Sequence, residues 1–167
     1  VPPTSFMKGL REICDKHGIM LIFDEVQSGF GRTGKWFALE HFDVVPDIIT
    51  AAKGIASGMP LSGVFTRADI MKKLDTGSIG GTYGGNAIAC AAGVATIRAM
   101  REEKMLENAT DKGIQLMTGL RKVQEEYPQI GDVRGKGLMI GTEFIADGGG
   151  HAETKQLVKD VIHAAEE

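Results

Sequence analysis

Two short apolar runs, each followed by charged residues, dominate the first third of the chain. Residues 19–23 (IMLIF) form the first run, which stops at Asp24 and Glu25, and residues 48–52 (IITAA) form the second, which stops at Lys53. Runs of this length and residue type predict strands. Because the hydrophobicity of the first run is continuous rather than alternating, we expect a strand buried on both faces, as in a parallel sheet.

Apolar residues spaced three or four positions apart predict helices around these strands. The expected helices cover residues 6–16, 68–74, 86–105, 106–126 and 154–167, with a helical turn at 36–41, a strand at 61–66, a strand pair or one bent strand at 133–144 and a loop at 147–150. Thr4 or Ser5 is expected to cap the first helix. The alanine-rich helix at 86–105 is expected to pack closely against another surface. The buried face predicted for the helix at 106–126 consists of Ile114, Leu116, Met117, Leu120 and Val123.

Bulk composition narrows the class of protein. The length of 167 residues fits one domain or one and a fraction. The net charge of -3, without a basic stripe, argues against a nucleic-acid partner, and no apolar run reaches membrane-spanning length. Cys14 and Cys90 lack metal-ligand spacing, so we expect no metal site and a reduced, cytoplasmic protein with both thiols buried. The opening Val1-Pro2-Pro3 reads as a connection inside a larger protein, so a fragment is expected.

Glycines punctuate the loop that follows the first strand. Gly29, Gly31 and Gly34 match the pattern GxGxxG, which in dinucleotide-binding domains turns a strand directly into a helix. Here Asp24 and Glu25 precede the loop, where their negative charge would repel a pyrophosphate, and no clear helix follows Gly34. We therefore favour a tight loop whose glycines adopt positive φ, and we keep a dinucleotide-binding domain as the least favoured alternative.

The two strand ends carry candidate chemistry. Ligands of open α/β sheets bind outside the carboxyl ends of the strands, which is where Asp24 and Lys53 are expected. Either residue alone is most simply a solvated surface charge. Lys53 ends an apolar run, however, and a partly buried lysine has a lowered pKa and becomes a usable nucleophile. A lysine with an aspartate is also the pair that a pyridoxal phosphate site requires.

A second glycine-rich stretch, residues 76–85, contains Thr82 within GGTYGG. A hydroxyl beside flexible backbone N–H groups suits a phosphate. Taken without Asp24 and Lys53, the stretch reads as a mobile loop.

Together, the motifs DEVQSGFGRTG, AKG and GGTYGGNAIAC resemble three successive signatures of the class III, ω-type aminotransferases of pyridoxal phosphate fold type I. They occur in the family's order and at matching separations. The stretch IGDVRGKGLMIGTEF resembles the entry to the family's C-terminal small domain. Within the family, GGTYGGN and IGDVRGKGLMIG look most similar to bacterial 4-aminobutyrate aminotransferases.

The resemblance implies a role for each matching residue. Lys53 would be the Schiff-base lysine and would carry the proton between cofactor and substrate carbons. Asp24 would pair with the pyridine nitrogen, Val26 would pack on the ring face, and Gln27 would hydrogen-bond near the ring hydroxyl. Thr82 would bind the phosphate of the cofactor in the neighbouring subunit of a dimer.

The resemblance also implies an architecture and an activity. Residues 1–127 would form the C-terminal part of the cofactor-binding large domain, a mostly parallel sheet flanked by helices, and residues 128–167 the start of an α+β small domain. The implied reaction is pyridoxal 5'-phosphate-dependent transamination between an ω-amino acid and a 2-oxo acid, in a homodimer or larger homo-oligomer. Family members are more than twice as long, so half of the cofactor pocket is absent, and the alternative is a non-catalytic, self-associating fragment.

Overall fold

The computed structural model describes residues 1–146 and 150–166, so most of the predicted loop at 147–150 and the last residue of the predicted final helix lie outside the described residues. In chain order the elements are α1 (Thr4–His17), β1 (Ile22–Asp24), η1 (Ala38–His41), β2 (Ile48–Ala51), η2 (Lys53–Ala56), β3 (Gly63–Thr66), α2 (Ala68–Met71), α3 (Ala87–Glu102), α4 (Met105–Glu126), β4 (Ile130–Lys136), β5 (Met139–Phe144) and α5 (His151–Glu166). Within these residues, no helix is both long and apolar enough to cross a membrane.

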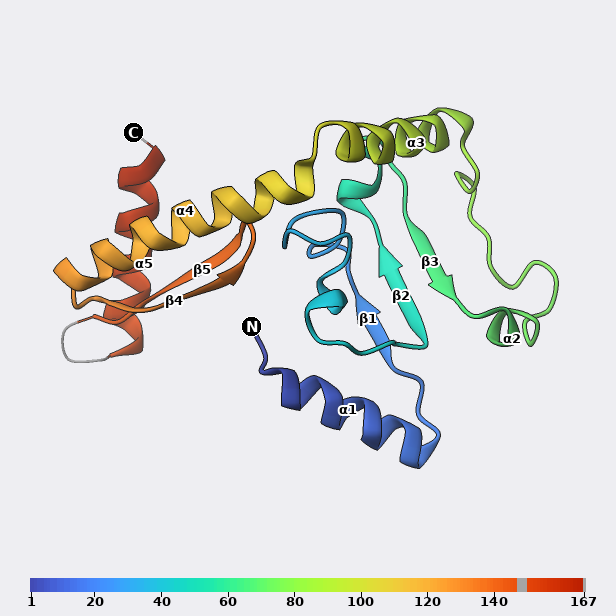
Figure 1. The fold of residues 1–167 in the computed structure, drawn as a ribbon, viewed down its shortest axis with the longest axis horizontal. Coiled ribbons are helices and arrows are strands. Elements are labelled where there is room, and N and C mark those ends of the chain that lie inside the picture. Colours follow the sequence, from blue (N-terminus) through green and yellow to red (C-terminus); the bar gives the residue numbers. More distant parts are fainter. Residues whose placement is uncertain (147–149, 167) are drawn as a thin grey trace.

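The first sheet has the order β1-β2-β3 (Figure 1). Strands β1 and β2 pair in parallel, whereas β2 and β3 pair antiparallel, so the described part of this sheet is mixed rather than mostly parallel. Strand β1 begins at Ile22 instead of residue 19, and Ile22 is 55% exposed, so the prediction of a strand buried on both faces is wrong for this chain. The core cluster packs α1 against Leu21, and the described residues leave the Ile22 side of β1 uncovered.

Helix α1 starts without the predicted cap. Its N-cap residue is Pro3, no side chain caps the helix, and Thr4 already lies in the first turn. The other end follows a common pattern, since Gly18 adopts φ 64° and its N–H bonds back to the last turn. Cys14 of this helix is buried in the core cluster, as predicted, but Cys90 on α3 is exposed, so the prediction for the second thiol is wrong.

Helices α3 and α4 bury small residues. Ala89 and Gly93 of α3 are buried, with Gly93 against Leu61 and Ile55, so the close packing predicted for this helix is confirmed. The buried face predicted for α4 is wrong at three of its positions: the buried residues are Ala109 and Gly113, and the exposed ones include Ile114, Leu116 and Val123. A methyl group at Gly113 would collide with the Gly137 carbonyl in the β4–β5 turn, and only glycine allows this approach.

Strands β4 and β5 form an antiparallel hairpin, which settles the stretch at 133–144 as a strand pair. Helix α4 packs along β4, and α5 packs against β5 (Figure 1). The turn of the hairpin reaches back to the glycine loop of the first half, where the Leu138 N–H donates to the Arg32 carbonyl at 2.9 Å. Residues more than a hundred positions apart thereby meet next to the sheet edge.

A buried carboxylate ties the first half together. Asp47 Oδ2 accepts hydrogen bonds from the Leu21 N–H at 2.8 Å and from Arg11 Nη1 at 2.9 Å, and Asp47 Oδ1 accepts one from Arg67 Nη1 at 2.7 Å. The Leu21 N–H and then the two guanidinium groups lower the pKa of Asp47 from its usual 3.8 to about 2. One side chain thus joins α1, the start of β1 and the segment after β3.

We expect Asp47→Ala to lower the free energy of unfolding by about 3 kcal/mol, because it leaves the Leu21 N–H without its acceptor and removes the more buried of the two carboxylates that pair with Arg11. Denaturant titration measures this loss. Asp15→Ala is a matched control, since Asp15 also pairs with Arg11 at 2.7 Å but its side chain is 67% exposed. That exposed i,i+4 pair contributes only about 0.5 kcal/mol. Equal losses in the two variants would contradict the anchoring role of Asp47.

The pH dependence of stability provides a second readout. Because the pKa of Asp47 is lower in the folded than in the unfolded chain, its stabilisation is present above pH 3.8 and is lost as the pH falls toward about 2. The wild-type chain should therefore lose stability more steeply than Asp47→Ala over this window. If the free energy of unfolding fell equally steeply with pH in the two proteins over this window, the lowered pKa assigned to Asp47 would be wrong.

Candidate functional site

The parallel pairing of β1 with β2 brings the two predicted chemical groups to one sheet edge. Asp24 lies opposite Thr50 in the register, and the Glu25 N–H donates to the Thr50 carbonyl at 2.9 Å. Lys53 comes two residues after the end of β2. The carboxyl ends of neighbouring parallel strands point to the same side of a sheet, so Asp24 and Lys53 lie at the same edge.

Asp24 keeps one oxygen of its carboxylate available. Oδ1 accepts a hydrogen bond from the Val26 N–H at 3.0 Å and another from the Thr50 hydroxyl at 3.3 Å. Among the described residues no donor meets Oδ2, and the side chain is exposed. Because β1 ends at Asp24 and a turn follows, strand alternation does not govern the residues beyond it; the carboxylate instead folds over the turn to Val26.

Glu25, the neighbouring acid, has a structural role. It is 3% exposed, and its carboxylate accepts hydrogen bonds from the Ser28 hydroxyl and from the backbone N–H groups of Ala38 and Leu39. These bonds fix both ends of the loop between β1 and η1. Glu25 therefore serves the fold, because its buried carboxylate is fully engaged in these bonds.

The glycine loop is a tight turn. Gly31 and Gly34 adopt φ 90° and φ 82°, and the Gly34 N–H donates to the Gly31 carbonyl at 3.0 Å. The next helical element is the short 3-10 helix η1, which begins only at Ala38. The predicted positive φ angles are confirmed at Gly31 and Gly34 and are wrong for Gly29, whose φ is not positive. The strand-to-helix turn that a dinucleotide-binding site needs is not formed here.

Lys53 opens η2 with unusual backbone geometry. Its φ is 47°, in the left-handed region that costs a non-glycine residue of order 1 kcal/mol or more. Such strain concentrates at functional sites, where the surrounding structure holds it in place. The residue is exposed, so the partial burial predicted from its position after an apolar run is wrong for the described chain. The following residue, Gly54, packs against Phe30 of the glycine loop.

A cavity of about 320 Å³ gathers three of the predicted site residues, Val26, Gln27 and Lys53. Its other lining residues are Gly29, Arg32, Gly54, Leu138 and Met139. Sequence reasoning treated Arg32 only as part of a loop. It gave no sign of Leu138 and Met139, because they come from the distant β4–β5 turn. Asp24 lines an adjacent, largely apolar cavity on the α1 side.

Thr82 lies apart from these groups. Residues 76–85 form turns between α2 and α3, all of them exposed, and Figure 1 shows this connection running outside the edge strand β3. Within the described residues Thr82 makes no hydrogen bond. The chain therefore does not bring Thr82 to its own Asp24 and Lys53.

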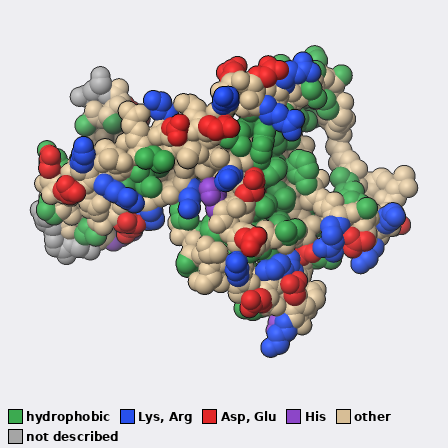
Figure 2. All heavy atoms as spheres, viewed as in Figure 1, with side chains coloured by type: hydrophobic (Ala, Val, Ile, Leu, Met, Phe, Trp, Pro, Cys, Tyr) green, Lys and Arg blue, Asp and Glu red, His purple; other side chains and the backbone are tan. Residues whose placement is uncertain are grey.

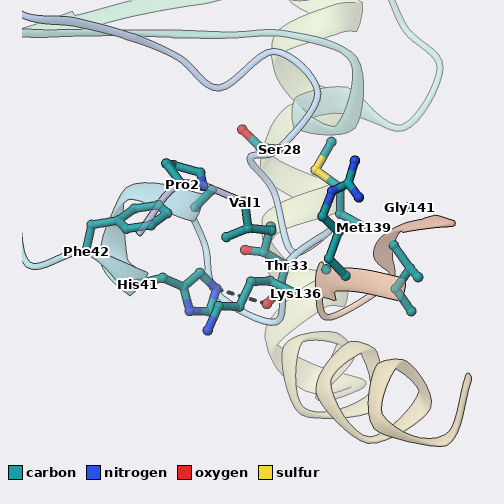
Figure 3. Close-up of a pocket in the computed structure, with 13 residues that line it drawn as sticks. Val1, Pro2, Ser28, Thr33, His41, Phe42, Lys136, Met139 and Gly141 are labelled. Carbon is teal, nitrogen blue, oxygen red and sulfur yellow. Dashed lines mark hydrogen bonds between the residues drawn. The ribbon is translucent and has the colours of Figure 1, made fainter. Parts of the chain in front are cut away.

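A second cavity, of about 440 Å³, is lined by Thr33 of the glycine loop, His41 and the β4–β5 hairpin (Figure 3). His41 Nε2 hydrogen-bonds to the Thr33 carbonyl oxygen at 3.1 Å beside it, and the Thr33 hydroxyl is buried without a partner among the described residues. Arg134 on its wall is already paired with Asp132 and Glu143. The cavity contains none of the predicted site residues.

Comparison with known proteins identifies the family. The family model for aminotransferase class III matches residues 1–167. The chain is 47% identical over 167 residues to a 5-aminovalerate aminotransferase of Pseudomonas aeruginosa, covering 100% of this chain and 39% of that protein. It is 47% identical over 161 residues to a 4-aminobutyrate aminotransferase of Escherichia coli, covering 96% and 38%. It is also 49% identical over 160 residues to a leucine/methionine racemase of Thermococcus litoralis, covering 96% and 35%.

Solved structures of transaminases also match this chain. An (S)-enantioselective omega-transaminase from Thermomicrobium roseum matches with a TM-score of 0.83 and 41% identity, over 88% of this chain and 34% of that one. A taurine:2-oxoglutarate aminotransferase from Bifidobacterium kashiwanohense, in complex with PLP and glutamate, matches with a TM-score of 0.83 and 38% identity, over 87% and 33%. The α/β fold class predicted from the sequence is confirmed. The chain spans 39% or less of each of these relatives and belongs to the class III aminotransferase family.

Proposed function

We propose that this chain carries the lysine half of a pyridoxal 5'-phosphate site that transfers an amino group from an ω-amino acid, similar to 4-aminobutyrate, to a 2-oxo acid. The observation that carries the proposal is the arrangement of Asp24 and Lys53 at the carboxyl ends of two paired parallel strands. The family membership and the printed names of the relatives support the reaction class.

The residues present fit the cofactor. The site needs an amine, a carboxylate with a free oxygen and room for a small ring. Lys53 supplies the amine and lines about 320 Å³ of space, and Oδ2 of Asp24, which lines a separate cavity at the same sheet edge, is free of donors among the described residues. That volume lies at the small end of the range for ligand sites, about 300–1,000 Å³. When bound, the cofactor supplies the electron sink for the carbon that loses a proton.

The chain's own residues then have distinct tasks. Lys53 Nζ would hold the cofactor and would carry a proton between cofactor and substrate carbons. Asp24 would keep the ring nitrogen protonated by offering it a negative partner. Val26 and Gln27, which line the cavity with Lys53, would pack on the ring and hydrogen-bond near its hydroxyl group.

Two parts of the architecture belong to the same proposal. We assign residues 1–127 to the large cofactor-binding domain and residues 128–167 to the start of the small domain. Helix α4 packs against β4 and so couples the two. The Leu138 N–H bond to the Arg32 carbonyl adds a second connection, at the cavity itself.

The assay that tests the proposed function is amino transfer. The chain, alone and joined to the remainder of its protein, is given 4-aminobutyrate or 5-aminovalerate, 2-oxoglutarate and pyridoxal 5'-phosphate, and glutamate formation is followed. We expect turnover by the complete protein. Inversion of leucine or methionine without amino transfer would instead favour the racemase activity named for the Thermococcus litoralis relative.

A non-catalytic, self-associating chain is the second candidate. Exposed apolar side chains favour it, among them Ile88 at 67% and Val94 at 58% on α3 and Val64 at 57% on β3. Figure 2 shows hydrophobic side chains gathered on the face beside α3 and the sheet. Glutamate formation by the isolated chain would rule this candidate out.

We expect the chain to form a homodimer or a larger homo-oligomer, with Thr82 reaching the cofactor of the neighbouring subunit. The uniformly exposed residues 76–85 and the apolar surfaces of α3 support this expectation. Light scattering combined with hydrogen exchange tests it: the mass should be at least twice that of the chain, and backbone amides of residues 76–85 should become protected on association. If the chain stays monomeric at high concentration and the amides of residues 76–85 are protected in the monomer, the expectation is wrong.

A further inference from the structure

The β4–β5 turn rests on glycines from two other parts of the chain. Gly137 lies in this turn and adopts φ 54°. A Cβ atom added at Gly113 of α4 would overlap the Gly137 carbonyl group, and one added at Gly137 would lie 2.7 Å from the Gly34 nitrogen. Both approaches are closer than a real Cβ atom tolerates. Helix α4, the turn and the glycine loop therefore meet backbone to backbone at these three glycines.

A hydrogen bond extends this contact into the glycine loop. The Leu138 N–H, next to Gly137, donates to the Arg32 carbonyl at 2.9 Å. The Phe30 N–H donates to the Trp36 carbonyl at 2.6 Å and so ties two distant points of the loop together. Because close-packed protein transmits strain, a displacement of the turn should move the loop as a unit.

The glycine loop packs in turn on the backbone beside Lys53. A Cβ atom added at Gly54 would lie 3.1 Å from Cβ of Phe30, so the loop and the residue after Lys53 are in close contact. Later in η2, a Cβ atom added at Gly93 of α3 would lie 3.5 Å from the Ile55 carbonyl oxygen. The short helix that Lys53 opens is therefore held by both the glycine loop and α3.

The backbone of Lys53 needs such support. Its φ of 47° lies in the left-handed region, where a residue with a Cβ atom persists only if the surrounding structure holds it there. The contact of Phe30 with Gly54 restricts the peptide group that follows Lys53. If the loop moved away from Gly54, Lys53 could relax to a negative φ, and its side chain would leave the cavity wall that it shares with Val26 and Gln27.

We propose that the contact between Gly113 and Gly137 is a positioning device for Lys53. It seats the β4–β5 turn on the glycine loop, and the loop holds Lys53 in its left-handed conformation through Phe30 and Gly54. The proposal rests on the proposed function for the chemical role of Lys53, whereas the positioning itself rests on the contacts. Gly113 and Gly137 act through the lysine and need touch no ligand.

Two substitutions in one helix isolate the contact. Gly113→Ala and Gly119→Ala both replace a glycine of α4 by the better helix former, so both favour the helix itself. Only Gly113→Ala puts a methyl group against the Gly137 carbonyl. Among the described residues, nothing lies within 4 Å of a Cβ atom at Gly119. A difference between the two variants therefore reports the contact and not helix propensity.

The first measurement is NMR of the backbone of Lys53, because the ¹³Cα and ¹³Cβ chemical shifts of a residue report the sign of its φ. We expect the shifts of Lys53 to move toward those of negative φ in Gly113→Ala and to stay unchanged in Gly119→Ala. The shifts of Leu21 and Asp47, which hydrogen-bond at the other end of the sheet, should stay unchanged in both variants. Unchanged shifts at Lys53 in Gly113→Ala overturn the proposal, as does an equal change in Gly119→Ala.

Gly137→Asn reaches the same contact from the turn. Asparagine tolerates left-handed φ, so this variant keeps the conformation of the turn while its Cβ atom collides with the backbone of Thr33 and Gly34. The shifts of Lys53 should change as in Gly113→Ala. A folded Gly137→Asn chain in which Lys53 keeps the wild-type shifts overturns the proposal, even if Gly113→Ala fails to fold.

The second measurement is reductive labelling of Lys53 by pyridoxal 5'-phosphate. The aldehyde carbon forms a C=N bond with Lys53 Nζ and releases water, and cyanoborohydride adds hydride to that bond. We expect the half-saturating concentration to rise about fivefold in Gly113→Ala, a size typical of coupling through packed contacts. The rate with formaldehyde, which needs only an accessible amine, should not change.

The two measurements separate this proposal from the proposed function. Equal effects of Gly113→Ala on pyridoxal 5'-phosphate and on formaldehyde overturn the positioning role, because the variant would then alter the accessibility of the amine and not its place in the cavity. If pyridoxal 5'-phosphate does not label Lys53 in the wild-type chain, the proposed function is wrong. The chemical shifts of Lys53 then still decide whether the glycine contact holds its backbone.

Discussion

Lys53→Ala is expected to abolish covalent attachment of pyridoxal 5'-phosphate at the sheet edge, because the variant removes the primary amine that lines the cavity with Val26 and Gln27. The measurement is borohydride reduction of the cofactor-treated chain followed by peptide mapping. A pyridoxyl group should appear on the peptide that contains residue 53 in the wild-type chain and be missing from the variant. In the complete enzyme, loss of the proton carrier should lower turnover by roughly 10²–10⁴-fold or more.

Lys35→Ala is the matched control for this variant. Lys35 is an exposed lysine that directly follows the glycine loop and lines a cavity that does not include Lys53. Its loss should leave the labelling of residue 53 intact. Since alanine also disfavours the φ of 47° at position 53, unfolding curves are needed to show that Lys53→Ala remains folded. If labelling of the wild-type chain falls mainly on other lysines, Lys53 is not the lysine that binds the cofactor.

The two strand ends were predictable because a local pattern and one rule of sheet geometry suffice to place them. Asp24 and Lys53 each follow a short apolar run, and parallel pairing brings such ends together. The φ values of Gly31 and Gly34 were predictable for a similar reason, since glycine is the residue that adopts them without strain. The sequence pattern could therefore predict features whose residues lie within about thirty positions of one another.

The rest of the cavity wall depends on a long-range contact. Leu138 and Met139 reach Lys53 only because α4 brings the β4–β5 hairpin back to the glycine loop. The pattern of apolar residues near Leu138 does not predict this contact between the β4–β5 hairpin and the glycine loop. The same limit explains the exposed Ile114 of α4, because a helical pattern identifies an apolar stripe but does not say whether the rest of the chain covers it. Ile22 and Cys90 were mispredicted for this reason as well.

Asp24→Ala should separate chemistry from folding. In the complete enzyme we expect turnover to fall by several orders of magnitude, because the variant removes the negative partner that keeps the ring nitrogen protonated. The fold should survive, since the Asp24 side chain is exposed and its two hydrogen bonds, from the Val26 N–H and the Thr50 hydroxyl, are local. Steady-state kinetics measures the first effect and denaturant titration the second. Asp47→Ala should show a large loss of stability instead.

Asp24→Asn sharpens the test because it preserves shape. An asparagine oxygen can still accept from the Val26 N–H, so the turn after β1 is retained while the negative charge is lost. If charge is what matters, Asp24→Asn should be nearly as inactive as Asp24→Ala and as stable as the wild-type chain. A fall in turnover of less than tenfold, which is roughly 1.4 kcal/mol of barrier, would show that Asp24 does not control the ring nitrogen. Asp24 would then be a solvated acid at a strand end, and the carboxylate partner of the cofactor would have to come from another part of the protein.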